Sequence, residues 1–169
     1  MKTILIKLSG ELFSYCNNDE CATNITDIAN QIKTLQKENI VGLVIGGGSF
    51  FRGASDGKRY NIRTITAHHV GMLATVMNGL ILHDVLKQHG IDSMHASSLR
   101  CPTIASSVSQ QIIEHAIEKR QCIVFSGGTG NPFVTTDTNA IVKALYIGAD
   151  EVWKATKVDG IYDSDPEKN

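Results

Sequence analysis

Short apolar runs alternate with helical periodicities along the whole chain. Five runs are short and apolar enough to be buried strands: Lys2 to Leu8, Ile40 to Ile45, Ile91 to Ala96, Cys122 to Phe125 and Glu151 to Ala155. Between them, apolar residues recur at the three- and four-residue spacing of one helix face, as in Ile25, Ile28, Ala29, Ile32 and Leu35; Val70, Leu73, Ala74, Met77, Leu80 and Ile81; Val108, Ile112, Ala116 and Ile117; and Ala140, Ile141, Ala144 and Leu145. We expect Asp137 to be the N-cap of the last helix.

This order of elements predicts an α/β protein. Strands that alternate with helices form right-handed βαβ units, which give a mainly parallel sheet with helices on both faces. We therefore expect a three-layer αβα sandwich, with residues 1–169 forming a single domain. Ligands of such sheets bind beyond the carboxyl ends of the strands.

Composition narrows the classes of partner. The chain has 169 residues, 42% of them hydrophobic, and a net charge of −1. Without a strongly basic patch it lacks the footprint of a nucleic-acid or anionic-membrane binder, so we expect a small metabolite in a cleft. The apolar run before Lys7 is too short for a signal peptide, and we expect no segment to approach a membrane span. These features favour a cytoplasmic protein.

Cysteine and histidine residues do not form a metal-binding pattern. Cys16, Cys21, Cys101 and Cys122 lack paired C-x-x-C spacing, so we expect reduced, partly buried thiols and no metal ligands. We interpret the scattered histidines as surface or helix-end residues, namely His83, His89, His95 and His115.

Phosphate-binding chemistry recurs at the predicted strand ends. The first strand ends in Lys7-Leu8-Ser9-Gly10, and the second ends in Gly46-Gly47-Gly48, followed by Arg52. Free backbone N–H groups at glycine turns, together with a lysine or arginine, can bind phosphate oxygens. Lys154 begins a segment with a second lysine and several carboxylates, which would suit a polyphosphate and its metal ion. Each of these segments is also compatible with an ordinary solvated turn.

The segment Gly127 to Thr138 follows an apolar strand and leads into a helix. Its glycines allow close backbone approach, its proline stiffens the turn and its threonines offer hydroxyls. We expect a small polar ligand there. Phosphoryl transfer needs mainly positioning and charge neutralisation, which these loops together could supply.

Taken in order, five segments closely resemble the bacterial uridylate kinase (UMP kinase) family, which has the amino acid kinase (carbamate kinase-like) fold. They are Lys7-Leu8-Ser9-Gly10-Glu11, Gly46-Gly47-Gly48-Ser49-Phe50-Phe51-Arg52-Gly53, Gly71-Met72-Leu73-Ala74-Thr75-Val76-Met77-Asn78-Gly79, Gly128-Thr129-Gly130-Asn131-Pro132-Phe133 through Asp137, and Lys154 to Gly160. The resemblance covers nearly the whole chain. It implies transfer of the γ-phosphate of ATP to UMP, with Mg²⁺ accompanying ATP and a homohexameric, allosteric assembly.

The resemblance also implies roles for individual residues. The expected catalytic residues are Lys7, Arg52, Asp137 and Lys154, with Asp137 orienting one or both lysines. ATP is expected at Lys7, Leu8, Ser9, Gly10, Gly48, Arg52, Thr156, Tyr162 and Asp165. UMP is expected at Gly47, His68, Thr129, Gly130, Asn131, Pro132, Phe133, Val134, Thr135 and Thr136.

The chain departs from the family pattern in three places. His68 stands where the family usually has an aspartate that accepts hydrogen bonds from the UMP ribose, and a neutral imidazole accepts only one such bond. The stretch between Glu11 and Ile25 lacks the glycine-rich segment associated with GTP activation. Family members continue well beyond Asn169, so we expect a domain that lacks its C-terminal part, and little ATP binding or turnover from these residues alone.

Two other functions remain open at this point. One is a kinase of the same fold that acts on a carboxylate or carbamate, and the other is a non-catalytic nucleotide-binding or subunit-interaction protein.

Overall fold

The computed structural model describes residues 1–13, 20–48, 50–51 and 53–155. Within these ranges, six parallel strands form one sheet: β1 (Lys2–Leu8), β2 (Asn39–Ile45), β3 (Ser93–Ser97), β4 (Ser106–Ser107), β5 (Cys122–Ser126) and β6 (Glu151–Lys154). Their order across the sheet is β4-β3-β5-β2-β1-β6. All five strands predicted from the sequence are present, and the two-residue strand β4 was not foreseen.

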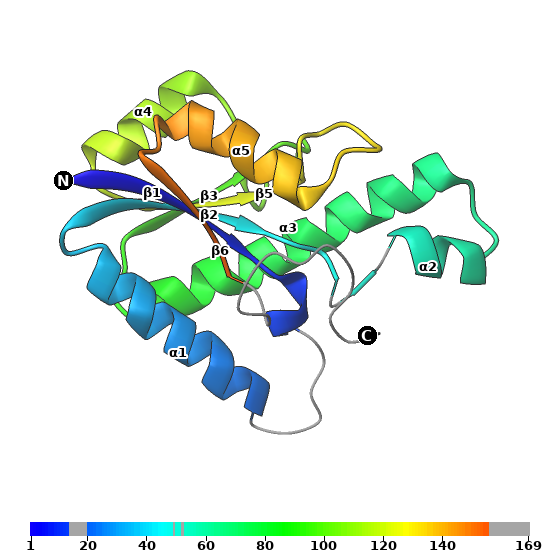
Figure 1. Cartoon of the computed structure of the whole chain (residues 1–169), viewed down its shortest axis with the longest axis horizontal. Helices are drawn as coiled ribbons and strands as arrows, with labels where there is room; N and C mark the ends of the chain where they lie inside the picture. Colours follow the sequence, from blue (N-terminus) through cyan, green and yellow to red (C-terminus); the bar gives the residue numbers. More distant parts are fainter. Residues whose placement is uncertain (14–19, 49, 52, 156–169) are drawn as a thin grey trace, which may run out of the picture.

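Helices cover both faces of this sheet. The elements are a short 3₁₀ helix η1 (Gly10–Phe13) and the α-helices α1 (Glu20–Leu35), α2 (Gly53–Arg59), α3 (Thr64–Gln88), α4 (Gln110–Glu118) and α5 (Thr136–Ile147). In Figure 1, α1 and α3 lie on one side of the strands and α4 and α5 on the other, while α2 packs beside the beginning of α3. The predicted three-layer αβα sandwich is therefore confirmed.

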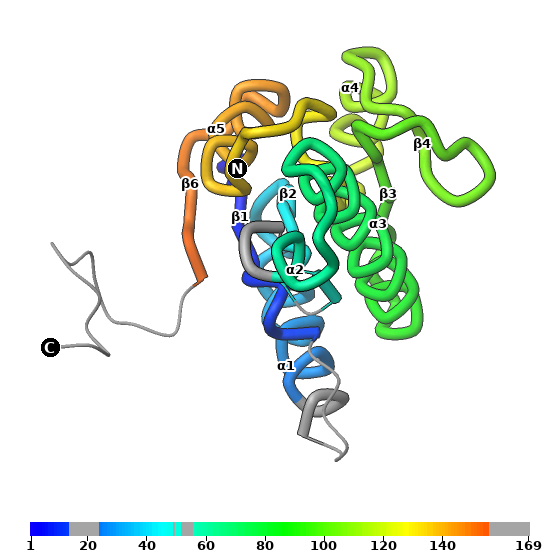
Figure 2. The backbone as a smooth tube through the Cα atoms, turned by 90° about the vertical axis from the view of Figure 1, so that its right-hand side faces the viewer, coloured from blue at the N-terminus to red at the C-terminus, as the bar shows by residue number. Residues whose placement is uncertain are grey.

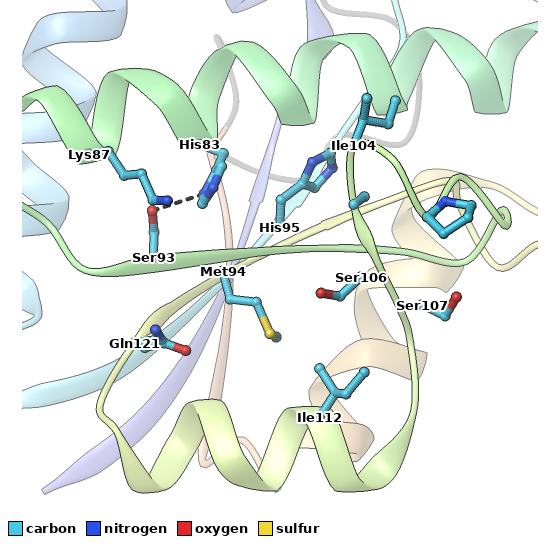
Figure 3. A pocket seen from close by; sticks show the side chains of 12 residues that line it. His83, Lys87, Ser93, Met94, His95, Ile104, Ser106, Ser107, Ile112 and Gln121 are labelled. Carbon is cyan, nitrogen blue, oxygen red and sulfur yellow. Dashed lines mark hydrogen bonds between the residues drawn. The ribbon is translucent and has the colours of Figure 1, made fainter.

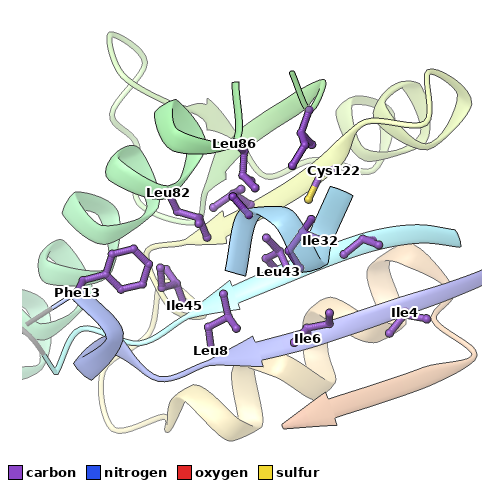
Figure 4. Close-up of a cluster of buried hydrophobic side chains, with 14 residues drawn as sticks. Ile4, Ile6, Leu8, Phe13, Ile32, Leu43, Ile45, Leu82, Leu86 and Cys122 are labelled. Carbon is purple, nitrogen blue, oxygen red and sulfur yellow. The ribbon is translucent and has the colours of Figure 1, made fainter. Parts of the chain in front are cut away.

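Each face of the sheet has its own apolar core, because successive side chains of a strand point to opposite faces. Ile4, Ile6 and Leu8 of β1 point to the α1 and α3 side, where they pack with Leu43, Ile45, Ile32, Leu82 and Leu86 (Figure 4). Leu5 of the same strand points the other way and joins Phe125, Ile113 and Ile147 under α4 and α5. The central strands are buried on both sides, as expected of a parallel sheet.

The register of β1 decides which side chains meet at the carboxyl edge. Lys7 is aligned with Val44 of β2 on one side and with Lys154 of β6 on the other. The two lysines therefore lie side by side on neighbouring strands, just before the chain leaves the sheet. Figure 2 shows β6 on the outside of β1, and in the described part of the chain β6 pairs with β1 only.

Helix α3 buries a different face from the one its sequence predicts. Of the predicted stripe only Ala74 is buried; Leu73, Met77, Leu80 and Ile81 are exposed, at 54%, 49%, 41% and 39%. The buried face instead includes Thr75, Asn78 and Gly79 among Met72, Val76 and Leu82. The helix is apolar nearly all round, so a periodicity argument could not select the correct face.

The length of α3 also corrects an expectation. By length and composition it is the one described helix that could cross a membrane, because it has 25 residues and contains an 18-residue stretch with a mean hydropathy of 1.3. However, Leu82 and Leu86 lie fully buried against the sheet, as in the core helix of a globular domain. The prediction that no segment approaches a membrane span in length was wrong.

Three smaller predictions also fail. Thr135, not Asp137, is the N-cap of α5: its hydroxyl accepts a hydrogen bond from the Thr138 N–H, which leaves the Asp137 carboxylate free for other contacts. Val108 precedes α4, whose N-cap is Ser109. His95 is buried in β3 at 4% exposure rather than lying on the surface. Cys101 and Cys122 are free thiols, and Cys16 lies outside the described residues.

Candidate functional site

Two lysines and one aspartate form a charged cluster at the carboxyl edge of the sheet. Lys7 Nζ lies 3.2 Å from Asp137 Oδ1, and Lys154 Nζ lies 2.9 Å from Asp137 Oδ2. Lys7 and Lys154 come from adjacent strands, whereas Asp137 comes from the first turn of α5. One carboxylate thus holds two ammonium groups, and the cluster retains one net positive charge.

The electrostatics of the cluster keep Asp137 ionised. The hydrogen bond from Lys154 lowers the pKa of the Asp137 carboxyl below its ordinary value, the charge of Lys7 acts in the same direction, and partial burial opposes both. Lys7 is the more enclosed lysine, with 17% of its side chain exposed against 58% for Lys154. The arrangement offers a fixed, partly sheltered ammonium and a more accessible one.

A cavity of about 480 Å³ opens beside this cluster. Lys7, Asp137 and Lys154 line its polar end, and its apolar wall comes from Ala140 and Ile141 of α5 and Val152 of β6. A pocket with mostly apolar walls and a few converging charged groups is typical of a small-ligand site.

Glycines at the ends of β1 and β2 bring two backbone segments into direct contact. A Cβ atom on Gly10 would lie 2.4 Å from Gly48 N, and one on Gly46 would lie 2.8 Å from Gly10 N. A side chain at either position would push the segments apart. The turns after β1 and β2 therefore form one unit, as a pair of phosphate-binding turns requires. Leu8 is buried in the core, so only its backbone can face a ligand.

Helix α3 holds the glycine turns of two different strands through polar side chains. Asn78 Nδ2 donates a hydrogen bond to Gly46 O at 2.7 Å, and Gly127 N–H donates to Thr75 Oγ1 at 2.7 Å. Both side chains are buried, and Gly47 packs so tightly on the same helix that a Cβ would lie 2.7 Å from Gly71 O. These roles of Thr75 and Asn78 were not predicted from the sequence, although polar residues within an apolar helix were the available signal.

The loop from Gly127 to Thr136 lies at the same edge, after β5. Gly127, Gly128 and Gly130 have φ angles of +74°, +58° and +81°, a region that strongly favours glycine. Thr129 Oγ1 accepts a hydrogen bond from Asn131 N–H, which closes the turn. Pro132, Phe133, Val134, Thr135 and Thr136 then lead directly to Asp137, so the loop and the charged cluster are continuous in the chain.

His68 is placed against this loop. Its ring lies 4.6 Å from the Phe133 ring, centroid to centroid, in a tilted arrangement. Phe133 itself is 64% exposed and has a φ of +66°, an uncommon conformation for a bulky residue. His68, for which the resemblance predicts a role in UMP binding, therefore contacts the loop in which the other UMP-binding residues are predicted.

The structure thus brings together most of the predicted site residues. Lys7, Ser9, Gly10, Gly47, Gly48, Asp137 and Lys154 lie at the carboxyl edge, and His68 contacts the loop 129–136. Four predicted site residues lie outside the described residues, namely Arg52, Thr156, Tyr162 and Asp165.

A second cavity, of about 460 Å³, lies beside β3 and β4, at the end of the strand order far from β1 and β6, and none of the predicted site residues lines it. His83, Lys87, Ser93 and His95 line one part of it, between α3 and β3 (Figure 3). His83 Nδ1 and Ser93 Oγ are 3.0 Å apart, and burial lowers the pKa of His95 to about 4. Burial also lowers the pKa of the His83 imidazole.

Comparison with known proteins identifies the family of this chain. The model of the amino acid kinase family matches residues 2–169, and the chain belongs to that family. A relative from Vesicomyosocius okutanii, named uridylate kinase, is 42% identical over 170 residues, which cover 99% of this chain and 71% of the relative. The predicted resemblance to the bacterial uridylate kinases is confirmed.

Solved structures agree. The UMP kinase of Ureaplasma parvum superposes with a TM-score of 0.89 at 35% identity, over 99% of this chain and 72% of that one. The UMP kinase of Bacillus anthracis gives the same TM-score at 31% identity, over 99% and 70%. The chain therefore has the fold of these nucleoside monophosphate kinases and spans about 70% of their length.

Proposed function

We propose that the chain transfers the γ-phosphate of ATP to UMP and produces UDP and ADP. The observation that carries this proposal is the arrangement of Lys7, Asp137 and Lys154 beside the glycine turns at the carboxyl edge. Phosphoryl transfer spreads negative charge over the transferring group, and preorganised cations and N–H donors stabilise that charge.

In this proposal the donor half of the site consists of Lys7 and the turns at Gly10 and Gly48. Asp137 keeps Lys7 and Lys154 in place without cancelling both charges, so one net positive charge faces the phosphates. Arg52, Thr156, Tyr162 and Asp165 complete this half in the family pattern. No general base is needed, because the UMP phosphate is already an anionic nucleophile.

The acceptor half consists of Gly47, His68 and the loop 129–136. Backbone N–H groups and threonine hydroxyls of the loop are suitable donors for a nucleotide. His68 and Phe133 would face the ribose or base as a pair of contacting rings.

Mg²⁺ would enter with ATP. Hard oxygen ligands suit it, and at such sites one or two carboxylates act together with substrate phosphates. Here Asp137 already engages two ammonium groups, and the described residues hold no cluster of three His, Cys, Asp or Glu side chains. These residues fit an ion coordinated mainly by the nucleotide, whose charge would then add to that of the lysines.

We also propose a homo-oligomeric, cytoplasmic protein, with a homohexamer as the specific expectation. The exposed apolar residues of α3, including Leu73 and Met77, supply a surface that self-association would cover. Residues 1–169 would form one amino acid kinase domain.

A coupled assay of ADP release tests the proposal against its alternatives. We expect ADP formation that depends on UMP, is weaker with CMP and is absent with glutamate, even if the absolute rate is low. Preference for glutamate would favour a carboxylate kinase of the same fold. Nucleotide binding without ADP release at any enzyme concentration would favour a non-catalytic protein.

A further inference from the structure

Lys143 of α5 is a buried lysine for which the proposed mechanism has no use. It is 4% exposed, and burial lowers the pKa of its ammonium group. None of the ion pairs found among the described residues includes it. Burying a charge without a counter-ion is costly, so a lysine at such a position needs an explanation.

The surroundings of Lys143 offer partial compensation from aromatic rings. Its Nζ lies 5.8 Å from the centroid of the Phe125 ring and 5.2 Å from that of the Tyr146 ring. Both rings are within the range at which cations are attracted to aromatic faces. The two rings stabilise the positive charge of Lys143, but they do not explain why its ammonium group points toward Ser98.

The ammonium group of Lys143 begins a chain of two hydrogen bonds that ends in the loop from Gly127 to Thr136, where UMP binding is predicted. Lys143 Nζ donates to Ser98 Oγ at 2.9 Å, and Ser98 Oγ donates to Gly128 O at 2.8 Å. An ammonium group can only donate, so it occupies an acceptor position of the hydroxyl and directs the hydroxyl proton to the Gly128 carbonyl. Bonds to a charged group are the stronger ones, and the chain is polarised throughout.

The backbone around Ser98 also packs directly against the glycines of this loop. A Cβ atom on Gly127 would lie 2.7 Å from Leu99 N and 2.8 Å from Ser97 Oγ, and one on Gly130 would lie 3.3 Å from Ser98 O. The left-handed glycines of the loop therefore rest directly on the backbone that Lys143 anchors. A shift of Ser98 would move the loop.

We propose that Lys143 is a positioning residue, which acts through Ser98 to hold the Gly127–Gly130 loop in the shape that binds the acceptor nucleotide. This inference rests on the proposed function of that loop. Lys143 does not reach the substrate itself: it sets the affinity for the acceptor by fixing the loop in advance, which reduces the cost of ordering it on binding. A merely structural lysine would change stability without changing acceptor affinity.

The test compares Lys143→Met with Lys143→Arg, Ser98→Ala and the double variant Lys143→Met/Ser98→Ala. Lys119→Met, at the exposed C-cap of α4, is the matched control for loss of one positive charge. Calorimetric titration measures UMP binding, and hydrogen exchange measures protection of the loop amides, of which Gly127 and Gly130 donate hydrogen bonds. Thermal unfolding records stability separately.

We expect Lys143→Met to weaken UMP binding by roughly tenfold and to speed exchange of the loop amides. Lys143→Arg should retain affinity within about threefold, because it keeps a charged donor. Ser98→Ala should weaken UMP binding to a similar extent. The double variant should bind UMP no more weakly than the weaker-binding single variant, because both substitutions break the same hydrogen-bond chain. Lys119→Met should bind as the unsubstituted chain does.

Wild-type affinity and wild-type loop exchange in Lys143→Met, with only a lower unfolding temperature, would overturn the inference. If the unsubstituted chain does not bind UMP, the proposed function fails, and loop exchange alone then decides the role of Lys143. If Lys143→Met does not fold, Ser98→Ala decides it: unchanged affinity and exchange in that variant would count against the proposal.

Discussion

Asp137 shares its two carboxylate oxygens between lysines from neighbouring strands, and this is the central residue-scale feature of the site. A lone lysine at a strand end would be solvated and mobile. Two lysines paired to one ionised carboxylate are held in place and still carry net positive charge, which is the property that phosphoryl transfer requires.

The aspartate that the resemblance predicts at the position of His68 leads to a prediction about UMP binding. We expect His68→Asp to tighten UMP binding by roughly fivefold, because a carboxylate can accept two hydroxyl hydrogen bonds where a neutral imidazole accepts one. Titration with UMP measures the change. His69→Asp is the matched control on the exposed neighbouring residue. An unchanged or weaker affinity in His68→Asp would mean that the ring contact with Phe133 matters more than the lost acceptor.

His95 makes stability depend on pH. Its pKa is lowered to about 4, chiefly by burial and secondarily by His83, while the unfolded chain takes up the proton near pH 6.5. Between these values the unfolded state binds more protons, so stability is fully present above about pH 6.5 and is lost as the pH falls toward 4. We expect the urea midpoint to fall over that range.

The variant His95→Gln cannot titrate and should show a shallower loss of stability with acid. His115→Gln, on the exposed face of α4, should keep the wild-type pH profile. Equal slopes for His95→Gln and the unsubstituted chain would contradict the assignment.

Among the elements, α3 shows what the sequence could and could not predict. Its position and helical character follow from its apolar periodicity, whereas its length does not, because the predicted stripe spans only Val70 to Ile81 of Thr64–Gln88. Its orientation does not either, because the buried face includes Thr75 and Asn78, which form hydrogen bonds with glycine turns far away in the sequence, while Leu73 and Met77 are exposed. Such tertiary contacts are invisible to a local pattern.

The candidate site was predictable to a similar extent. Alternating strands and helices bring Lys7, Lys154 and the start of α5 to one edge, so their clustering follows from topology. The supporting residues Ser98 and Lys143 could not be predicted from the sequence. A lysine on a helix is normally assigned to the solvent face, and only the structure shows that Lys143 is buried.

The N-terminus of α5 gives an element-scale prediction. Thr135→Ala removes the hydroxyl that caps the Thr138 N–H, and we expect a loss of about 1 kcal/mol in unfolding free energy. Urea denaturation measures it. Thr64→Ala, at the exposed start of α3, where the cap residue makes no side-chain hydrogen bond, should cost clearly less. Equal losses in the two variants would contradict the assignment of the cap.

At the scale of the whole molecule, the outward face of α3 exposes Leu73, Met77, Leu80 and Ile81 together. A contiguous apolar face of this kind is typical of an association surface. We expect Met77→Glu to shift the protein toward smaller species in sedimentation velocity, because it places a charge within that face. Asn30→Glu, exposed on α1, should leave the distribution unchanged. If Met77→Glu and the unsubstituted chain had identical distributions of species, this face would not be an association interface.

We infer that Lys7 and Lys154, held by Asp137, form the phosphoryl-transfer site of a UMP kinase. This role is tested most directly by transfer of label from γ-labelled ATP to UMP, compared between the unsubstituted chain, Lys7→Met and the control Lys119→Met. We predict labelled UDP at a low but measurable rate from the unsubstituted chain and the control, and a loss of roughly a hundredfold or more in Lys7→Met. Undiminished labelled UDP from Lys7→Met, or label transferred to glutamate and not to UMP, would contradict this role of the two lysines.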